Sequence, residues 1–303
     1  MERAAESERR EYRFGPSTVQ EMDAMNASET FVGGSDGLRR RLDWAVKIAR
    51  EAGEITLRYF CSEIEIERKA DDSPVTVADR EAESHLRRRI AEAFPEDGVV
   101  GEEWGTAEGS GAYRWILDPI DGTKSFIHGV PLYGTLVGIV YEDRAAAGVA
   151  RIPALDECVY AAEGMGAWYV RGDSPPQPAH VSSCRRLAEA AWVTSEVANF
   201  DHVGRRDAFF RLQESARLVR TWGDAYGYLL VATGRVDFMI DPLMQVWDAA
   251  AVAPIIREAG GRFSDWQGVY SFASGNGFGS NDLLHEEVLA VLSAPPPETS
   301  PRS

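Results

Sequence analysis

The feature that most constrains the fold is a block of short β-type runs in the middle of the chain. The runs are RWILD, YGTLVGIVY, AAAGVARI and ECVYAAE, between residues 114 and 163. Turn residues separate each run from the next, and the following EGMGAWYV carries glycines suited to a hairpin. Strands are therefore expected to cluster in this part of the chain.

Helices are expected on both sides of this block. Apolar residues recur at helical spacing from Leu38 to Phe60, and a second helix is predicted from about Arg80 to Phe94. Strands and helices alternate in the last third of the chain. The predicted strands there are AAWVTS and RVDFMID, and the predicted helices are around residues 204–216, in DAYGYLLVATG and in WDAAAVAPIIREAGG. This order predicts an α/β or α+β layered protein with two sheet-containing halves.

The two halves are flanked by segments without a sustained apolar period. Residues 1–36 mix charges with Ser, Gly and Met, and residues 295–303, PPPETSPRS, are polar and rich in proline. We expect a flexible N-terminal extension at 1–36 and a disordered tail at 295–303. The N-terminal half, 37–149, should carry most of the candidate site described below, and the C-terminal half should span 150–294.

The charge of the chain excludes some classes of function. Its formal net charge is −16, whereas a nucleic-acid binder needs a basic stripe that displaces counterions from phosphates. No stretch approaches the roughly 18 to 20 consecutive apolar residues that cross a bilayer, and no targeting pattern begins the chain. We therefore expect a cytoplasmic protein that binds neither nucleic acid nor membrane. With an anionic substrate, divalent cations would be needed to invert the local charge.

The segment WILDPIDGTKSF, residues 115–126, holds two aspartates three positions apart, Asp118 and Asp121. Residues at this spacing in a regular strand point to opposite faces, so the carboxylates converge only if the chain leaves β geometry between them. Pro119 favours that departure because it lacks an N–H and fixes φ. The following Gly-Thr can begin a helix whose free N–H groups attract an anion. A strand end with an Asx turn explains the motif equally well when it is taken alone.

Metal ligation fits this spacing better than nucleophilic catalysis. Phosphotransferases with an aspartyl nucleophile place their carboxylates two apart, on one face of the strand end, and here the spacing is three. Mg²⁺ prefers several oxygen ligands, so further carboxylates are needed. The candidates are Glu102 and Glu103 in VVGEEWG, Asp248 in QVWDAAA and Asp79 in SPVTVADREAE. Each alone has an ordinary alternative, a helix-capping aspartate or a solvated Glu-Glu pair.

In chain order these motifs resemble those of the inositol monophosphatase superfamily of Mg²⁺-dependent, lithium-sensitive phosphatases. G-E-E, D-P-I-D-G-T, and W-D-A-A with E-A-G-G follow one another, and the similarity spans about residues 38–292. The resemblance implies a layered α/β sandwich with the active site between its two halves. It also implies two or three Mg²⁺ ions. Their ligands would be Glu102, Asp118, the backbone carbonyl of Ile120, Asp121 and Asp248.

The resemblance further implies catalytic roles for nearby residues. Glu102 and Thr123, with Thr123 paired to Asp79, would orient a metal-activated water for in-line attack on phosphorus. The backbone N–H groups of Gly122 and Thr123 would bind the phosphate. Lys69 matches a basic residue often found near such sites. The expected partner is a small phosphate monoester, and the expected assembly is a homodimer.

The alcohol of the substrate is harder to predict. DPIDGTKSFIHGVPLYGTLVGIV and the segment from Trp222 to Gly261 resemble the histidinol-phosphatase branch. Ala225 departs from that branch, which commonly has cysteine there, and Glu196 resembles the inositol-type segment. Asp224 and Asp241 are candidates to bind the ammonium and imidazole of histidinol phosphate by charge-assisted hydrogen bonds. We therefore expect hydrolysis of histidinol phosphate in histidine biosynthesis.

Two alternatives remain at this stage. One is a phosphatase of inositol 1-phosphate, or of sugar or nucleotide phosphates more broadly. The other belongs to a different class, an inactive relative that binds metal or phosphate and regulates a partner. Such relatives usually lose a ligand, whereas every acidic position of the motif set is filled here. The sequence therefore favours an active phosphatase.

Overall fold

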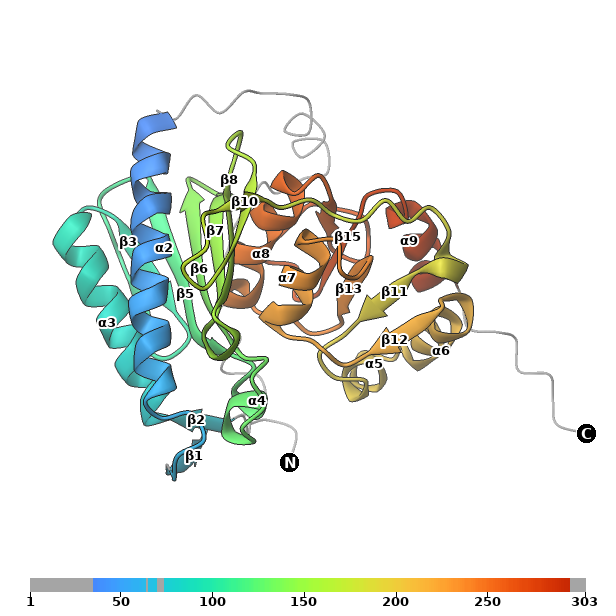
Figure 1. The fold of residues 1–303 in the computed structure, drawn as a ribbon, viewed down its shortest axis with the longest axis horizontal. Coiled ribbons are helices and arrows are strands. Elements are labelled where there is room, and N and C mark those ends of the chain that lie inside the picture. The colour runs from blue at the N-terminus through green and yellow to red at the C-terminus, as the bar shows by residue number, and fades with distance from the viewer. Residues whose placement is uncertain (1–34, 64, 70–73, 295–303) are drawn as a thin grey trace, which may run out of the picture.

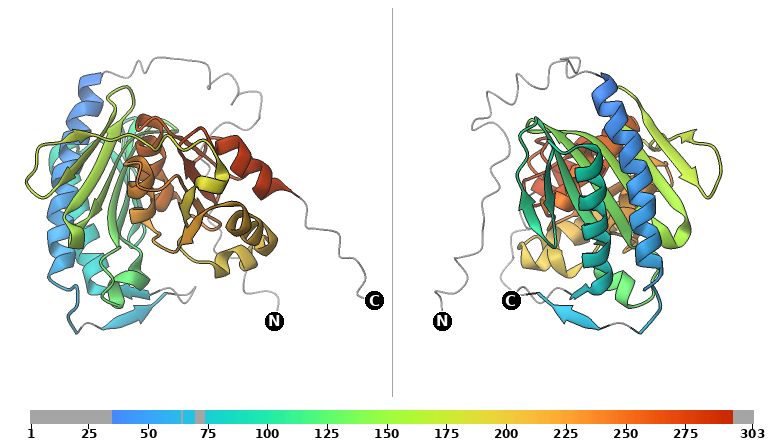
Figure 2. Two further views of the ribbon diagram at one scale, coloured as in Figure 1. Left: turned by 45° about the vertical axis from the view of Figure 1, so that its right-hand side comes forward. Right: turned by 90° about the vertical axis from the view of Figure 1, so that its left-hand side faces the viewer.

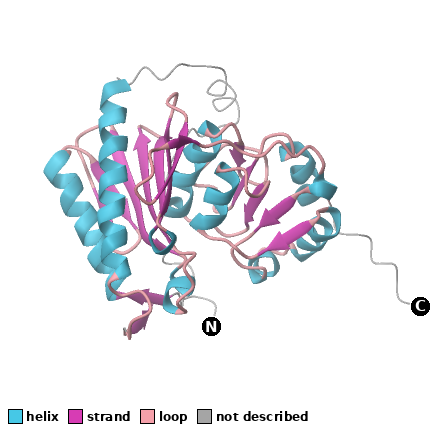
Figure 3. Ribbon diagram, viewed as in Figure 1, coloured by secondary structure: helices cyan, strands magenta, loops and turns pink. Residues whose placement is uncertain are grey.

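The computed structural model describes residues 35–63, 65–69 and 74–294, which form alternating layers of helix and sheet (Figure 1, Figure 2). Helices α2 and α3 cover the outer face of a large sheet, and α7 and α8 lie between that sheet and a smaller one. Helices α5, α6 and α9 cover the far side of the smaller sheet, and the alternation is clear in Figure 3. This is the layered α/β sandwich that the sequence predicts.

The outer helices form where apolar residues recur at helical spacing. They are α2 (Ser35–Leu57) and α3 (Val77–Ala93), and they bury apolar residues from Leu38 to Ile90 against the large sheet. That sheet is eight-stranded. Its strands, in spatial order, are β10 (Gln177–Pro178), β9 (Ala167–Arg171), β8 (Glu157–Ala162), β7 (Arg144–Ile152), β6 (Gly134–Tyr141), β5 (Tyr113–Asp121), β3 (Gly98–Gly101) and β4 (Gly105–Ala107). Neighbours are antiparallel except β3 and β5, which are parallel.

The middle layer consists of α7 (Ala225–Ala232) and α8 (Val246–Glu258). Both helices are largely apolar around their circumference, as burial between two sheets requires. Glycines on β6 and β7 let α8 approach closely. A Cβ on Gly138 would lie 2.9 Å from the α8 backbone, and one on Gly148 would lie 1.9 Å from the carbonyl oxygen of Ala251. This contact fixes the position of α8, whose first turn carries Asp248.

The smaller sheet is five-stranded, and an aromatic cluster packs on its far side. Its strands, in spatial order, are β12 (Leu218–Arg220), β11 (Ala191–Val193), β13 (Phe238–Asp241), β15 (Gly277–Ser280) and β14 (Arg262–Ser264), covered by α5 (Ala198–His202), α6 (Arg206–Ser215) and α9 (His285–Ser293). Trp192 stacks on Phe238 with ring centroids 5.6 Å apart, which ties β11 to β13. The remaining elements are β1 (Ile66–Arg68), β2 (Pro74–Thr76), α4 (Thr123–Ile127) and the 3₁₀ turns Pro153–Leu155 and Leu187–Glu189.

The two sheet-containing halves divide later in the chain than the predicted boundary at residues 149 and 150. That boundary falls inside β7, which pairs with β6 on one side and β8 on the other. The large sheet continues to Pro178, and the smaller sheet begins at Ala191. Consecutive β-type runs carry no sequence signal for the point at which one sheet ends, because each hairpin simply extends the ladder.

The predicted extension and tail fall mainly outside the described residues. Residues 1–34 and 295–303 lie outside them, and Ser35 and Asp36 already belong to α2. Among the helices that the structure describes, none combines the length and apolar character that a bilayer crossing requires.

We predict that Gly148→Ala lowers the free energy of unfolding by about 1–3 kcal/mol, the usual cost of an added methyl group in a packed contact. The new Cβ would overlap the carbonyl of Ala251, so α8 has to move. Urea unfolding followed by circular dichroism measures the change.

The matched control is Gly37→Ala in α2, where a Cβ meets no atom closer than 3.6 Å. That variant should be as stable as the wild type or up to about 1 kcal/mol more stable. Equal stability of Gly148→Ala and the wild type would show that this contact does not position α8.

Candidate active site

Asp118 and Asp121 lie at the end of β5, where the strand leaves regular pairing. Asp118 pairs with Leu136 of β6 and Asp121 pairs with Gly134, so β5 contains one extra residue at this point. The bulge cancels the strand alternation and brings both carboxylates to the same side. Asp118 Oδ1 also accepts the N–H of Ile120 at 3.0 Å. The Asx turn and the convergence of carboxylates, posed as alternatives by the sequence, are thus both present.

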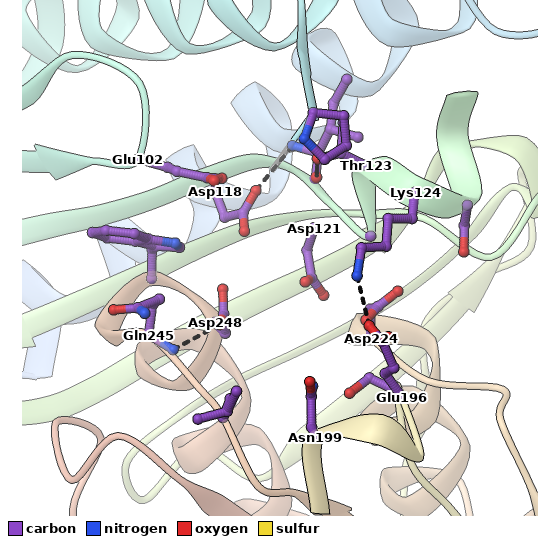
Figure 4. A pocket seen from close by; sticks show the side chains of 17 residues that line it. Glu102, Asp118, Asp121, Thr123, Lys124, Glu196, Asn199, Asp224, Gln245 and Asp248 are labelled. Atoms are coloured by element: carbon purple, nitrogen blue, oxygen red, sulfur yellow. Dashed lines mark hydrogen bonds and ion pairs between the residues drawn. The ribbon is translucent and has the colours of Figure 1, made fainter. Parts of the chain in front are cut away.

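The third carboxylate of this cluster, Asp248, comes from the first turn of α8. It is the third residue of the helix, and its Oδ2 accepts the N–H of Gln245 at 2.7 Å in a reciprocal capping box. The capping bond fixes the side chain of Asp248 toward β5. Carboxylate oxygens of Asp118, Asp121 and Asp248 all lie within 4.8 Å of one another. Figure 4 shows the three side chains converging.

This acidic cluster has the electrostatics of a cation site. Burial raises the pKa of Asp118 well above its usual value, and the charges of Glu102, Asp121 and Asp248 raise it further. The pKa of Asp121 rises in the same way, from burial and the charge of Asp224. Burial raises the pKa of Asp248 to about 8. A divalent cation fits this set of hard oxygen donors, because its charge would offset their repulsion.

Glu102 follows β3 and lines the same cavity, with Lys69 beside it. The Lys69 Nζ donates to Glu102 Oε1 at 2.7 Å and to Glu103 Oε1 at 2.6 Å. Burial lowers the pKa of Lys69, but the two carboxylates outweigh burial and raise it above its usual value. The side chain of Glu103 is buried, which raises its pKa to about 7. Of the Glu-Glu pair, Glu102 is therefore the residue that faces the site.

Asp79 and Thr123 are not hydrogen-bonded to each other in the described structure, contrary to the pairing implied by the resemblance. Oδ2 of Asp79 caps α3 instead, accepting the N–H of Thr76 at 2.8 Å and its hydroxyl at 2.6 Å. Thr123 donates its hydroxyl to the Ile120 carbonyl at 3.1 Å. The helix cap therefore takes one oxygen of Asp79. The other, Oδ1, is buried without a hydrogen-bond partner among the described residues, a costly state that a bound ligand would relieve.

Gly122 joins β5 to α4 with a backbone conformation that suits only glycine. Its φ is 85°, in the left-handed region, and a Cβ there would lie 2.6 Å from Oδ2 of Asp224. The residue after it, Thr123, begins α4, whose first N–H groups have no acceptor within the helix, and both Gly122 and Thr123 line the cavity. These N–H groups are the candidate phosphate contacts predicted from D-P-I-D-G-T.

Most of the candidate residues line one cavity of about 640 Å³ (Figure 4). Asp79 and Asp241 are not among the residues that line it. Glu102 and Asp118 lie at one end of it. At the other end Lys124 of α4 donates to Oε2 of Glu196, which follows β11, at 2.6 Å. This exposed ion pair links the two halves of the molecule across the cavity.

Of the two predicted leaving-group carboxylates, Asp224 lines the cavity and Asp241 lies behind it. Asp241 is 5% exposed and accepts the Ser195 hydroxyl at 2.6 Å. It lines a separate pocket of about 40 Å³ that Asp224 shares. Asp241 ends β13, and its pairing with Gly277 of β15 holds it at the sheet rather than at the cavity wall. Burial raises the pKa of Asp241 to about 7 and that of Asp224 to about 6.

The backbone at Asp224 is strained, and the strained turn makes two contacts at this site. Its φ of 42° and ψ of −143° belong to a region that residues other than glycine seldom occupy. The turn brings the N–H of Ala225, the first of α7, onto Oδ2 of Asp121. It also places the carboxylate of Asp224 beside Gly122. The strained turn at Asp224 therefore connects the start of α7 to the end of β5 through the hydrogen bond between Ala225 and Asp121.

Comparison with known proteins identifies the family. The model described as "Inositol monophosphatase family" matches residues 38–295. The chain belongs to the inositol monophosphatase family. A relative from Chlorobaculum parvum named histidinol-phosphatase is 40% identical over 253 residues, which is 83% of this chain and 96% of the relative. A Mycobacterium tuberculosis protein of the same name is 38% identical over 251 residues, 82% of this chain and 96% of its own.

The fold places the protein in the same family. A solved inositol monophosphatase of Thermotoga maritima matches with a TM-score of 0.75 and 32% identity, covering 84% of this chain and 96% of that structure. As a member of the inositol monophosphatase family with histidinol-phosphatase relatives, the protein is a phosphomonoesterase.

Sequence reasoning missed several residues of this phosphomonoesterase. Ser195, Asn199 and Gln245 line the cavity, but in sequence they look like any polar residue at the end of a strand or helix. Glu83 bonds the turn that carries Glu102. A signal existed for Glu83, because it lies four residues after Asp79 and so shares a face of the predicted helix.

We predict that Asp121→Asn abolishes the rise in melting temperature that Mg²⁺ gives to the wild type. Asn keeps an oxygen for the Ala225 N–H, so the variant without Mg²⁺ should be at least as stable as the wild type, because one repelling charge is gone. Differential scanning fluorimetry with and without Mg²⁺ measures both effects. Asp143→Asn, at an exposed turn, is the control and should keep the full Mg²⁺ response. An unchanged Mg²⁺ response in Asp121→Asn would contradict the assignment.

We also predict that Mg²⁺ binding tightens as the pH rises from 6 to 8. The pKa of Asp248, raised to about 8, lies in this range, and burial raises the pKa values of Asp118 and Asp121 in the same direction. A cation has to displace the protons that these carboxylates bind, so alkaline pH favours the cation. Each proton released changes the affinity by up to about tenfold per pH unit. Isothermal titration calorimetry at several pH values measures this, and an affinity independent of pH would refute it.

Proposed function

We propose that this protein is a Mg²⁺-dependent phosphomonoesterase that hydrolyses histidinol phosphate to histidinol and phosphate in histidine biosynthesis. The observation that carries the proposal is the charge at the end of the cavity opposite Glu102 and Asp118, where Asp224 and Glu196 lie. Carboxylates there suit a leaving group with an ammonium and an imidazole. The histidinol-phosphatase relatives support the same substrate. We further propose a cytoplasmic homodimer.

The donor set supports a site for two or three Mg²⁺ ions. Glu102, Asp118, the Ile120 carbonyl, Asp121 and Asp248 would hold them, since three of these carboxylates converge within 4.8 Å. Bound Mg²⁺ would supply an acidified water and would offset the charge on the phosphoryl oxygens.

The side chains and backbone groups of the site would carry out the remaining catalytic roles. Glu102 would accept the proton of the attacking water. The Thr123 hydroxyl gives its hydrogen to Ile120, which leaves its oxygen lone pairs to orient that water. Oδ1 of Asp79, without a partner among the described residues, would accept a further hydrogen bond at the site. The N–H groups of Gly122 and Thr123 would seat the phosphate, and Asp224 would bind the leaving group.

A second candidate function has an observation in its favour. Lys124 already pairs with Glu196 at 2.6 Å, so one acidic group at the leaving-group end is neutralised before any substrate enters. That arrangement suits a neutral polyol, as in inositol 1-phosphate or a sugar or nucleotide phosphate, and the Thermotoga maritima relative of known structure is an inositol monophosphatase. An inactive regulatory role is less favoured, because all the predicted acidic ligands are present.

Phosphate release from a small panel of monoesters tests the proposal. We expect the wild type with Mg²⁺ to have a higher kcat/KM for histidinol phosphate than for inositol 1-phosphate, fructose 1,6-bisphosphate or a nucleoside monophosphate. A strong preference for inositol 1-phosphate would replace the first function with the second.

Glu196→Gln sharpens the same prediction. Loss of one charge-assisted hydrogen bond costs about 1.5–3 kcal/mol, so kcat/KM for histidinol phosphate should fall roughly 10-fold to 100-fold. The value for inositol 1-phosphate should change little, because that alcohol carries no positive charge. Glu214→Gln, on the exposed side of α6, is the charge-matched control and should leave both values unchanged.

A further inference from the structure

Glu102 sits in a tight turn whose backbone needs hydrogen-bond partners. Residues 102–104 connect β3 to β4 as a three-residue hairpin loop closed by Gly101 and Gly105, with Gly105 at a φ of 66°. The N–H of Glu102 donates to the Leu117 carbonyl of β5 at 3.2 Å. The next two N–H groups of the loop, those of Glu103 and Trp104, are accepted by a group outside the hairpin.

The carboxylate of Glu83 on α3 accepts both of those N–H groups. Oε2 receives the N–H of Glu103 at 2.7 Å, and Oε1 receives the N–H of Trp104 at 3.2 Å. Arg87, one helical turn later, donates its Nε to Oε1 of Glu83 at 2.7 Å and its Nη2 to the carbonyl of Gly105. The Glu83–Arg87 pair therefore binds the turn on its N–H side and on its carbonyl side.

The local sequence makes room for this buried carboxylate. The side chain of Glu83 has no exposed surface, a position that costs free energy for a charged group unless it is fully paired. A Cβ on Gly101 would lie 2.1 Å from Oε1 of Glu83, so only glycine lets β3 pass this close. An apolar side chain could fill the same space without needing hydrogen-bond partners of its own. The presence of a buried glutamate instead indicates that its hydrogen bonds to the turn are what this position requires.

The same helix also carries Asp79, which the sequence predicts as a site residue. Asp79 lies one turn before Glu83 on α3, and its Oδ1 is buried without a hydrogen-bond partner among the described residues. Helix α3 thus places Asp79 directly and places Glu102 through Glu83. The side-chain end of Glu102 is held separately by Lys69 at 2.7 Å.

From these contacts we infer that Glu83, backed by Arg87, is a positioning residue that clamps the 102–104 turn on α3 and so fixes Glu102 for metal binding and catalysis. The inference rests on the function proposed above, in which Glu102 is a ligand. Groups that orient metal ligands typically affect metal affinity or activity by about 10-fold to 100-fold.

The test compares Glu83→Gln with the wild type. Gln has nearly the same shape, but its NH₂ faces a backbone N–H where the second carboxylate oxygen had accepted one, so the turn is released. We expect faster hydrogen–deuterium exchange in the 101–105 segment and a 10-fold to 100-fold higher Mg²⁺ dissociation constant by calorimetry. Glu51→Gln is the control, because it breaks an ion pair to Arg89 of the same helix, away from the turn, and should leave both values unchanged.

A double-mutant cycle separates positioning from general stability. Glu83→Gln should weaken Mg²⁺ binding strongly in the wild type but less than twofold in a Glu102→Gln background, where no carboxylate remains to be positioned. The same proportional loss in both backgrounds would overturn the inference.

Gly101→Ala provides an independent perturbation, since its Cβ displaces the Glu83 carboxylate without removing it. It should reproduce the faster exchange and the weaker Mg²⁺ binding, and it serves if Glu83→Gln does not fold. Slow exchange at 101–105 together with wild-type Mg²⁺ affinity in either variant would refute the clamp. If the wild type itself does not bind Mg²⁺, the proposed function fails, and the exchange rates alone decide whether Glu83 holds the turn.

Discussion

The mutual repulsion of three buried carboxylates is the constraint on which the rest of the structure depends. Asp118, Asp121 and Asp248 bring their oxygens within 4.8 Å in a space where burial already disfavours charge. Such a cluster spreads apart unless the backbone holds it or a proton or cation neutralises part of its charge. The fold provides the first. In the proposed function, a divalent cation bound here would offset the same repulsion, and its affinity would come from that.

A different local structural feature holds each carboxylate of the cluster in place. Each of these features depends on how the surrounding layers of helix and sheet pack. The β5 bulge turns Asp118 and Asp121 to one side. A capping box directs Asp248 at the start of α8, and glycines on β6 and β7 let that helix lie close enough to the sheet. The strained turn at Asp224 brings α7 onto Asp121. Both halves of the molecule therefore contribute to one site, which explains why it lies between them.

Much of the fold was predictable because it follows from local periodicity. The helices from Leu38 and from Arg80, and the alternation after residue 190, appear as predicted within a few residues. The division between the halves was not predictable, since β7 looks like any other β-type run and only its partners show that it lies inside the sheet. Thr123 and Asp79 illustrate the same limit at the site. Both were predicted from the resemblance to bond to each other, whereas in the structure the cap at Thr76 takes one oxygen of Asp79.

The sequence by itself determined which acidic residues are available, because carboxylates next to Pro, Gly and helix starts leave a readable local pattern. It also determined the family through the order of those motifs. Only the tertiary structure decided which of them share a cavity: Asp224 and Glu196 line it, Asp241 lies behind it, and Glu83 reaches the turn of Glu102 from a neighbouring helix. The physical reason is that convergence depends on the packing distance between layers, a property of pairs of distant segments that no single stretch of chain contains.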